Sequence, residues 1–163
     1  MAELTPLDEK LGEVLGLAQA AQAATDTVRR MEGADAFAGD LDEMRTQAEQ
    51  TEQRTDALVD TLEGRKTAIR EKARETKSEA SEMMKTYLSG EEEALDGFEF
   101  LAMAEAGELG HWEIVQQMAA TSGAADVRGL AAWAVRIQRE HVERVRRASL
   151  ELAAEEAREM AAS

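Results

Sequence analysis

The only two histidines of this chain each follow a carboxylate or its amide analogue by three residues. His111 follows Glu108, and His141 follows Gln138. In an α-helix, residues i and i+3 share a face, so each histidine lies beside its partner. Helical bundles that hold two metal ions use Glu-x-x-His on inward faces. The two pairs therefore predict a carboxylate and imidazole site for iron or manganese, since these ligands suit both metals.

The C-terminal half supplies most of the candidate ligands. Glu105, Glu108 and His111 fall on three successive steps of one predicted helix face. A hairpin turning near residues 124–125 brings Glu108 level with His141. Both histidines fall on apolar stripes. We therefore expect both imidazoles to be buried, with Glu108 approaching His141.

The other candidate ligand positions are less well suited to a metal site. Glu52 lies near the inward edge of its predicted helix, whereas Glu13 sits off the main apolar stripe. Gln138 stands where a second Glu-x-x-His would need a glutamate. Gly107 and Gly110 lie inside a predicted helix, where glycine costs about 1 kcal/mol relative to alanine. They indicate the close approach of another helix or a local distortion.

Hydrophobic periodicity predicts four helices and a crossover, with no competing strand signal. The expected helices span about 6–32, 41–63, 90–121 and 126–160, and a charged, mostly helical crossover spans about 65–88. Two hairpins joined by such a connection make an antiparallel four-helix bundle, here a single domain over residues 1–163. The alternative is one helix from Leu41 through Gly64 to Leu88. At about 75 Å long, it would suit a coiled-coil rod.

Composition supports an all-α protein and excludes several functions. Hydrophobic residues make up 44% of the 163 residues and aromatic residues only 4%, so alanine, leucine, valine and methionine must form the core. The net charge of −15 disfavours nucleic-acid binding. The absence of cysteine excludes disulfides and thiolate metal sites. Because no segment resembles a signal peptide or a membrane span, we expect a soluble, cytoplasmic protein without membrane contacts.

Two segments resemble the YciE/YciF-like branch of bacterial ferritin-like proteins. One is Thr51 to Leu58, followed by the charged crossover. The other is Glu105 to Trp112, followed by Gly123 and the helix that carries Trp133 to Glu143. The likeness covers roughly residues 40–155. It implies a ferritin-like four-helix fold, a homodimer and induction under stress, with no established reaction.

Related ferritin-like proteins suggest a metal centre in the bundle interior. Residue by residue, the resemblance carries this role to Glu52, Glu105, Glu108, His111 and His141. The chain departs from the family at Gln47, which stands where members often have a histidine.

Two hypotheses about function follow from these patterns. The first is a ferritin-like metal protein that binds iron or manganese and reacts with oxygen or peroxide. The second is a non-enzymatic helical scaffold or interaction protein with a vestigial polar core. A histidine on an apolar stripe is often a hydrogen-bonded core residue, which keeps the second hypothesis open. The sequence does not decide whether the chain is an enzyme, and it names no substrate.

Overall fold

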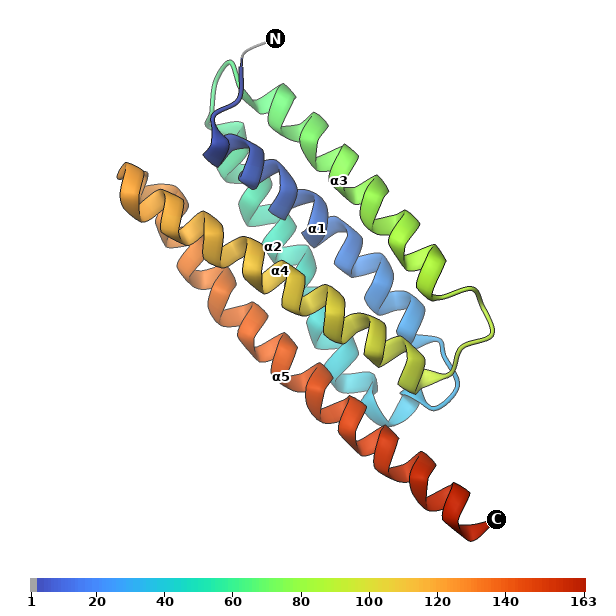
Figure 1. Ribbon diagram of the computed structural model, residues 1–163. Helices are drawn as coiled ribbons and strands as arrows, with labels where there is room; N and C mark the ends of the chain where they lie inside the picture. The colour runs from blue at the N-terminus through green and yellow to red at the C-terminus, as the bar shows by residue number, and fades with distance from the viewer. Residues whose placement is uncertain (1–2) are drawn as a thin grey trace.

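The computed structural model describes residues 3–163, and within them it contains helices and no strands (Figure 1). The elements are α1 (Pro6–Arg29), the short 3-10 helix η1 (Ala34–Phe37), α2 (Ala38–Asp60), α3 (Lys66–Tyr87), α4 (Ala94–Ser122) and α5 (Ala125–Ala162). The predicted all-α class is confirmed. The alternative of one helix from Leu41 to Leu88 is wrong, because the chain turns between α2 and α3 with Gly64 at a φ of 81°.

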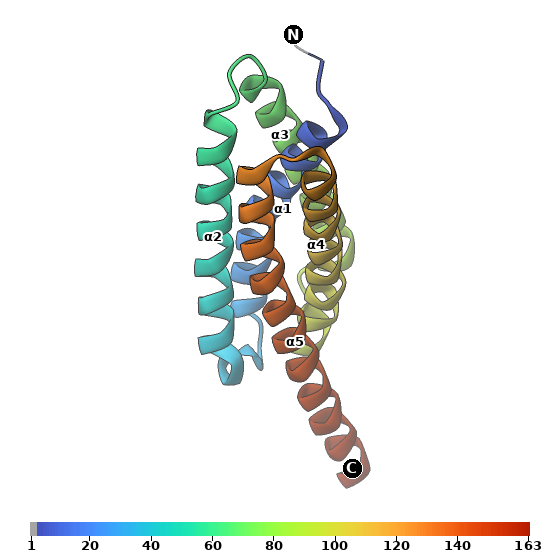
Figure 2. The ribbon, with the colours of Figure 1, turned by 90° about the vertical axis from the view of Figure 1, so that its left-hand side faces the viewer.

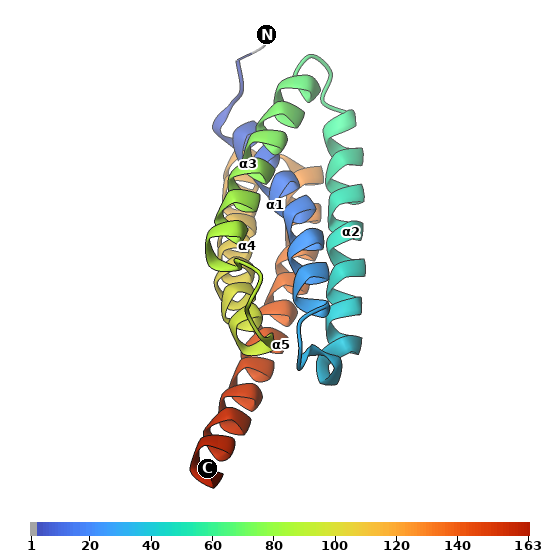
Figure 3. The ribbon, with the colours of Figure 1, turned by 90° about the vertical axis from the view of Figure 1, so that its right-hand side faces the viewer.

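The helices form a ring of four with a fifth outside it. α1 packs against α2, α3 and α4, while α5 packs against α4 and α2. The ring α1–α2–α5–α4 therefore closes, and α3 runs along the outer side of α1 (Figures 2 and 3). The last turns of α5 project past the other helices (Figure 1). Within residues 3–163 no helix is both long and apolar enough to cross a membrane.

The start of α1 is fixed by a capping box that also holds α3. The Thr5 hydroxyl accepts from the backbone N–H of Asp8, and the Asp8 carboxylate accepts from the backbone N–H of Thr5. Pro6 occupies the first helical position, where its missing N–H costs nothing. The Asp8 carboxylate also accepts from Arg65 at 2.9 Å. One buried carboxylate thus joins the first turn of α1 to the residue that precedes α3.

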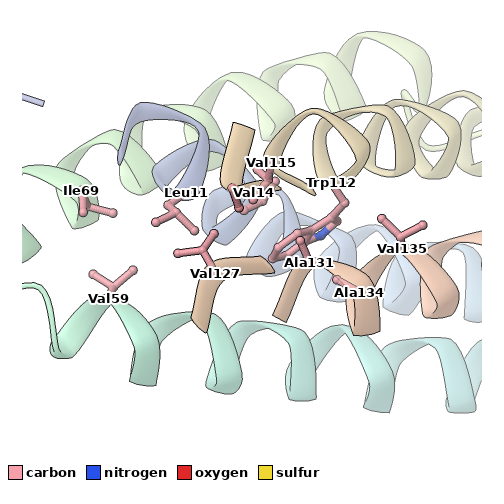
Figure 4. Close-up of a cluster of buried hydrophobic side chains, with 11 residues drawn as sticks. Leu11, Val14, Val59, Ile69, Trp112, Val115, Val127, Ala131, Ala134 and Val135 are labelled. Atoms are coloured by element: carbon pink, nitrogen blue, oxygen red, sulfur yellow. The ribbon is translucent and has the colours of Figure 1, made fainter. Parts of the chain in front are cut away.

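The interior divides along the bundle axis into two apolar clusters and a polar belt between them. Trp112 lies in the first cluster (Figure 4), and Phe98 lies in the second. Between them every helix of the ring carries polar side chains. Those buried almost completely are Thr51, Thr55, Glu105, Glu108, Gln138 and His141. This polar belt brings the candidate site residues to the middle of the bundle.

Two glycines let α3 lie unusually close to α1. A Cβ added at Gly12 would stand 2.8 Å from the carbonyl oxygen of Ile69, and one added at Gly16 would stand 2.4 Å from that of Ala73. Both distances are well inside van der Waals contact with rigid backbone. Gly12 and Gly16 therefore allow α3 to pack closely against α1.

We expect Gly16→Ala to destabilise the protein by about 1–3 kcal/mol, because the new methyl group must push the α3 backbone away. Gly110→Ala is the matched control. A Cβ there meets nothing within 4 Å, so removing a helix-interior glycine should stabilise by about 0.5–1 kcal/mol. Urea unfolding measures both. Equal stability of the two variants would show that the protein does not depend on close packing of α3 at Gly16.

Candidate functional site

Glu105 is the centre of a hydrogen-bonded network that joins three helices. Its carboxylate, on α4, accepts from the Gln138 amide of α5 at 2.7 Å, and the same oxygen lies 3.4 Å from Nδ1 of His141. His141 is 1% exposed. Its Nε2–H donates to the Gln47 side-chain oxygen of α2 at 2.7 Å. Each member of this network is therefore partnered inside the protein.

The contacts of His141 fix the orientation of its ring. The Gln47 side-chain oxygen can only accept a hydrogen bond, so Nε2 of His141 carries the hydrogen of that bond. Nδ1 then faces the Glu105 oxygen at 3.4 Å, a longer contact than the 2.7 Å hydrogen bond from Gln138. The Gln138 amide is therefore the nearer of the two partners of the Glu105 carboxylate.

Glu108 is buried like Glu105 but has no such partners. The residue is 4% exposed, and no hydrogen bond contributes to the pKa of its carboxyl group. Burial, and then the negative charge of Glu105, raise the pKa of Glu108 well above its ordinary value. Glu108 is therefore a buried acid that holds its proton to a higher pH than an exposed glutamate does, and it lines an open space.

That space is a groove of about 420 Å³ between α1, α3 and α4. Its walls are mostly apolar and include Leu17, Ala20, Ala21 and Ala24 of α1, Met83 and Met84 of α3, and Phe100, Leu101, Met103 and Ala104 of α4. Its polar side chains are Thr76, Glu79, Ser81, Glu105, Glu108 and His111. Neither lysine nor arginine lines the groove. Glu105 thus belongs both to the groove wall and to the buried network.

The expectation that both imidazoles are buried is met by His141 and is wrong for His111. The His111 side chain is 39% exposed. Its Nδ1–H donates to the carbonyl oxygen of Gly107 at 2.8 Å, and its Nε2 lies 3.5 Å from the Glu13 carboxylate of α1. Six residues of α-helix turn His111 about 120° away from Glu105. His111 therefore reaches the groove edge when Glu105 points inward.

Glu52 lies in a different contact from the other candidate ligands. Its carboxylate accepts from the Gln22 amide of α1 at 2.5 Å and from the Gln19 amide at 3.4 Å. Sequence reasoning missed Gln19 and Gln22. The signal that could have found them is two amides three residues apart in the middle of α1, level with the polar belt.

Only one pair of the five predicted metal ligands is in direct contact. Glu105 touches His141, while Glu108 and His111 line the groove and Glu52 binds the α1 amides. Among residues 3–163, no group of three or more histidine, aspartate or glutamate side chains is arranged to hold a metal ion. The metal assignment therefore stays a prediction.

The two glycines beside Glu108 do not mark a close helix contact, so that expectation is wrong. A Cβ added at Gly107 or at Gly110 would meet nothing within 4 Å. Gly107 instead borders the groove, whereas Gly110 does not. A side chain at position 107 would stand at the groove, which makes the two glycines a matched pair for experiment.

We expect Glu108→Gln to stabilise the protein, and to do so more at pH 8.0 than at pH 5.5. A pKa raised by folding means that the native state holds the Glu108 proton more tightly than the unfolded chain does. Stability therefore falls as the pH rises from the unfolded pKa, about 4.3, toward the folded pKa. Glutamine cannot ionise, so it removes this loss. Urea unfolding at the two pH values measures the effect.

The exposed Glu99 of the same helix supplies the control for this test. Glu99→Gln should change the free energy of unfolding by less than about 0.5 kcal/mol at either pH. A gain from Glu108→Gln that is as large at pH 5.5 as at pH 8.0 would show that Glu108 ionises freely.

Comparison with known proteins identifies no relative of this chain. No family model matches it, and neither does any curated protein or solved structure. The features that bear on its function are the groove, the buried network and the two carboxyl groups, Glu105 and Glu108.

Proposed function

We propose that this chain is a helical binding protein that takes up an elongated apolar small molecule in the groove between α1, α3 and α4. The observation that carries the proposal is Glu108, a buried carboxyl group without a hydrogen-bond partner in the groove wall. Small-molecule sites are apolar concavities of about 300–1,000 Å³ with a few convergent polar groups. The 420 Å³ groove fits that description.

Glu108 differs from its neighbour Glu105 in what its carboxyl group meets. A buried polar group that loses its partner costs about 1–3 kcal/mol, and the Glu108 carboxyl group has the groove beside it in place of a partner. One helical turn away, Glu105 has Gln138 and His141 as partners. α4 therefore carries two buried carboxyl groups. Glu105 has hydrogen-bond partners within the protein, whereas Glu108 borders the groove. A ligand with a hydrogen-bond donor or a positive charge would complete the second.

The architecture that presents this groove is, we propose, ferritin-like. Two features support this assignment. The α1–α2 and α4–α5 hairpins are joined by a crossover, α3, that runs the length of the bundle. Gln138 and His141, three residues apart on α5, also meet Glu105 of α4 in the interior, as facing helices do in ferritin-like metal proteins.

A metal centre is the second candidate function, and the contact between Glu105 and His141 favours it. The donors around this contact fit a metal poorly. Two of the four side chains, Gln47 and Gln138, are neutral amides, and Gln47 already binds the Nε2 nitrogen that a metal would use. We therefore rank metal binding, with iron or manganese, below small-molecule binding. A purely structural role for the network is the third reading.

We expect the neutral dye Nile red to bind with increased fluorescence, and Gly107→Phe to weaken its binding at least about tenfold. The phenyl ring would fill the groove beside Glu108, where nothing now stands within 4 Å of the Cβ position. Fluorescence titration gives both dissociation constants.

Gly110→Phe is the control for the groove test. It replaces a second helix-interior glycine that also has open space around it but does not line the groove. Its affinity for Nile red should equal that of the unmodified protein. Equal loss in both variants would place the dye elsewhere on the bundle, and no binding at all would reject the groove as a ligand site.

The metal hypothesis has a separate test. Manganese(II), at a hundredfold excess over its dissociation constant, should stabilise the unmodified protein by about 2.7 kcal/mol if the Glu105–His141 site holds it. Glu105→Gln should abolish that gain. Thermal unfolding with and without the ion measures both. Equal gains would place the metal on surface carboxylates, and no gain would favour the structural role of the network.

A further inference from the structure

We propose that the groove selects a linear aliphatic amine in its ammonium form, with its nitrogen against Glu108 and Glu105. This inference rests on the proposed function, because it names the class of molecule that the groove takes. Its grounds are the charge of the lining, the shape of the walls and the unpartnered carboxyl group. Each points to the same ligand.

The charge of the lining favours a cation. Glu79, Glu105 and Glu108 line the groove, and neither lysine nor arginine does. The only basic lining residue, His111, turns its Nε2 toward the Glu13 carboxylate at 3.5 Å. A carboxylate ligand would therefore be repelled, and a neutral ligand would gain no ionic contact. An ammonium group would meet two carboxyl groups in a partly dry setting, where such charge-assisted hydrogen bonds are strong.

The side chains of the walls suit an unbranched alkyl chain. The α1 lining consists of Leu17 and three alanines, whose small side chains leave room beside the helix. Met83 and Met84 of α3 also line the groove. Methionine side chains are flexible and adapt to apolar partners. An alkyl chain can therefore pack against this lining while its end group meets the carboxyl groups.

Binding of the ammonium form has a definite proton balance. Without ligand, burial and the charge of Glu105 raise the pKa of Glu108, so the carboxyl group holds its proton to a higher pH than an exposed glutamate does. Beside an ammonium group the carboxylate becomes the favoured form. In each molecule that is protonated before binding, the O–H bond of Glu108 then breaks, its proton passes to the buffer, and the ligand keeps all three N–H bonds. Amine binding therefore releases protons.

The other ionisable groups around Glu108 come from every helix packed there. Glu105 and His111 are on the same helix, and Glu79 is on α3. α1 contributes Glu13 through its contact with His111, and α5 contributes His141 through its contact with Glu105. None of these side chains contributes a hydrogen bond to the pKa of Glu108.

The test compares three molecules that share one alkyl chain and differ only at the end group. Octylamine, octanol and octanoate each compete with Nile red at pH 7.5. We expect octylamine to bind at least about tenfold more tightly than octanol, and octanoate to bind most weakly. In Glu108→Gln the ratio of octylamine to octanol affinity should fall, because only the Glu105 carboxylate then remains for the ammonium group. Glu99→Gln, an exposed change on the same helix, should keep the ratio of the unmodified protein.

Calorimetry in two buffers of different ionisation enthalpy supplies an independent readout. Octylamine should release protons from the unmodified protein and none from Glu108→Gln, whereas octanol should release none from either. A ratio near one in the unmodified protein, or a ratio that Glu108→Gln leaves unchanged, would overturn the amine proposal. In those cases Nile red binding would still stand as evidence for the groove. Absence of Nile red binding would overturn both proposals.

Discussion

The burial of one carboxylate, that of Glu105, is the constraint on which the rest of this bundle depends. A buried ionised group without partners costs several kcal/mol, so the fold must bring polar groups to it. α5 provides Gln138 and His141, and α2 provides Gln47 behind His141. These contacts fix how α4, α5 and α2 are aligned along the axis. A shift of one helical turn would leave the carboxylate unpartnered, while the apolar clusters on either side would tolerate it better.

The fifth helix adds a second constraint, which is steric rather than electrostatic. α3 lies so close to α1 that only glycine fits at positions 12 and 16. Further along α1 the groove wall is made of Leu17 and alanines, and α3 and α4 flank it from either side. α1 is thus in tight contact with α3 at its two glycines and borders open space at Leu17 and the alanines that follow. The position of α3 on α1 therefore helps to form the groove, because α3 supplies one of its walls.

Much of the fold could be predicted from the sequence, because helix periodicity and turn residues are local signals. The helix bounds agree with the structure to within a few residues for most elements. The site was harder to predict, since it depends on small rotations about the helix axis. Glu105 and Trp112 are seven residues apart and both point inward, whereas His111 is turned about 120° from Glu105. Spacing of three along a helix keeps two residues adjacent, but it does not keep a third residue on the same face.

The pairing across helices could not be read from the sequence at all. Gln47 and His141 are 94 positions apart, and no pattern in either segment of the sequence indicates that they are in contact. Glu52 was placed near the interior correctly, but its partners proved to be amides of α1 rather than other ligands. The choice between a metal centre and a hydrogen-bonded network depends on such partners. Sequence patterns identify which residue types reach the interior, and only the packed structure shows what each one meets.

Glu105 links the groove to the far side of the bundle. A positive charge in the groove would attract the Glu105 carboxylate, which also accepts from Gln138 and lies 3.4 Å from Nδ1 of His141. His141 in turn donates from Nε2 to Gln47 of α2, so these contacts run from the groove wall to the opposite helix. α2 contributes no residue to the groove, yet this contact lets it respond to what the groove holds. The hydrogen bonds that stabilise the buried Glu105 carboxylate therefore also connect the groove to α2.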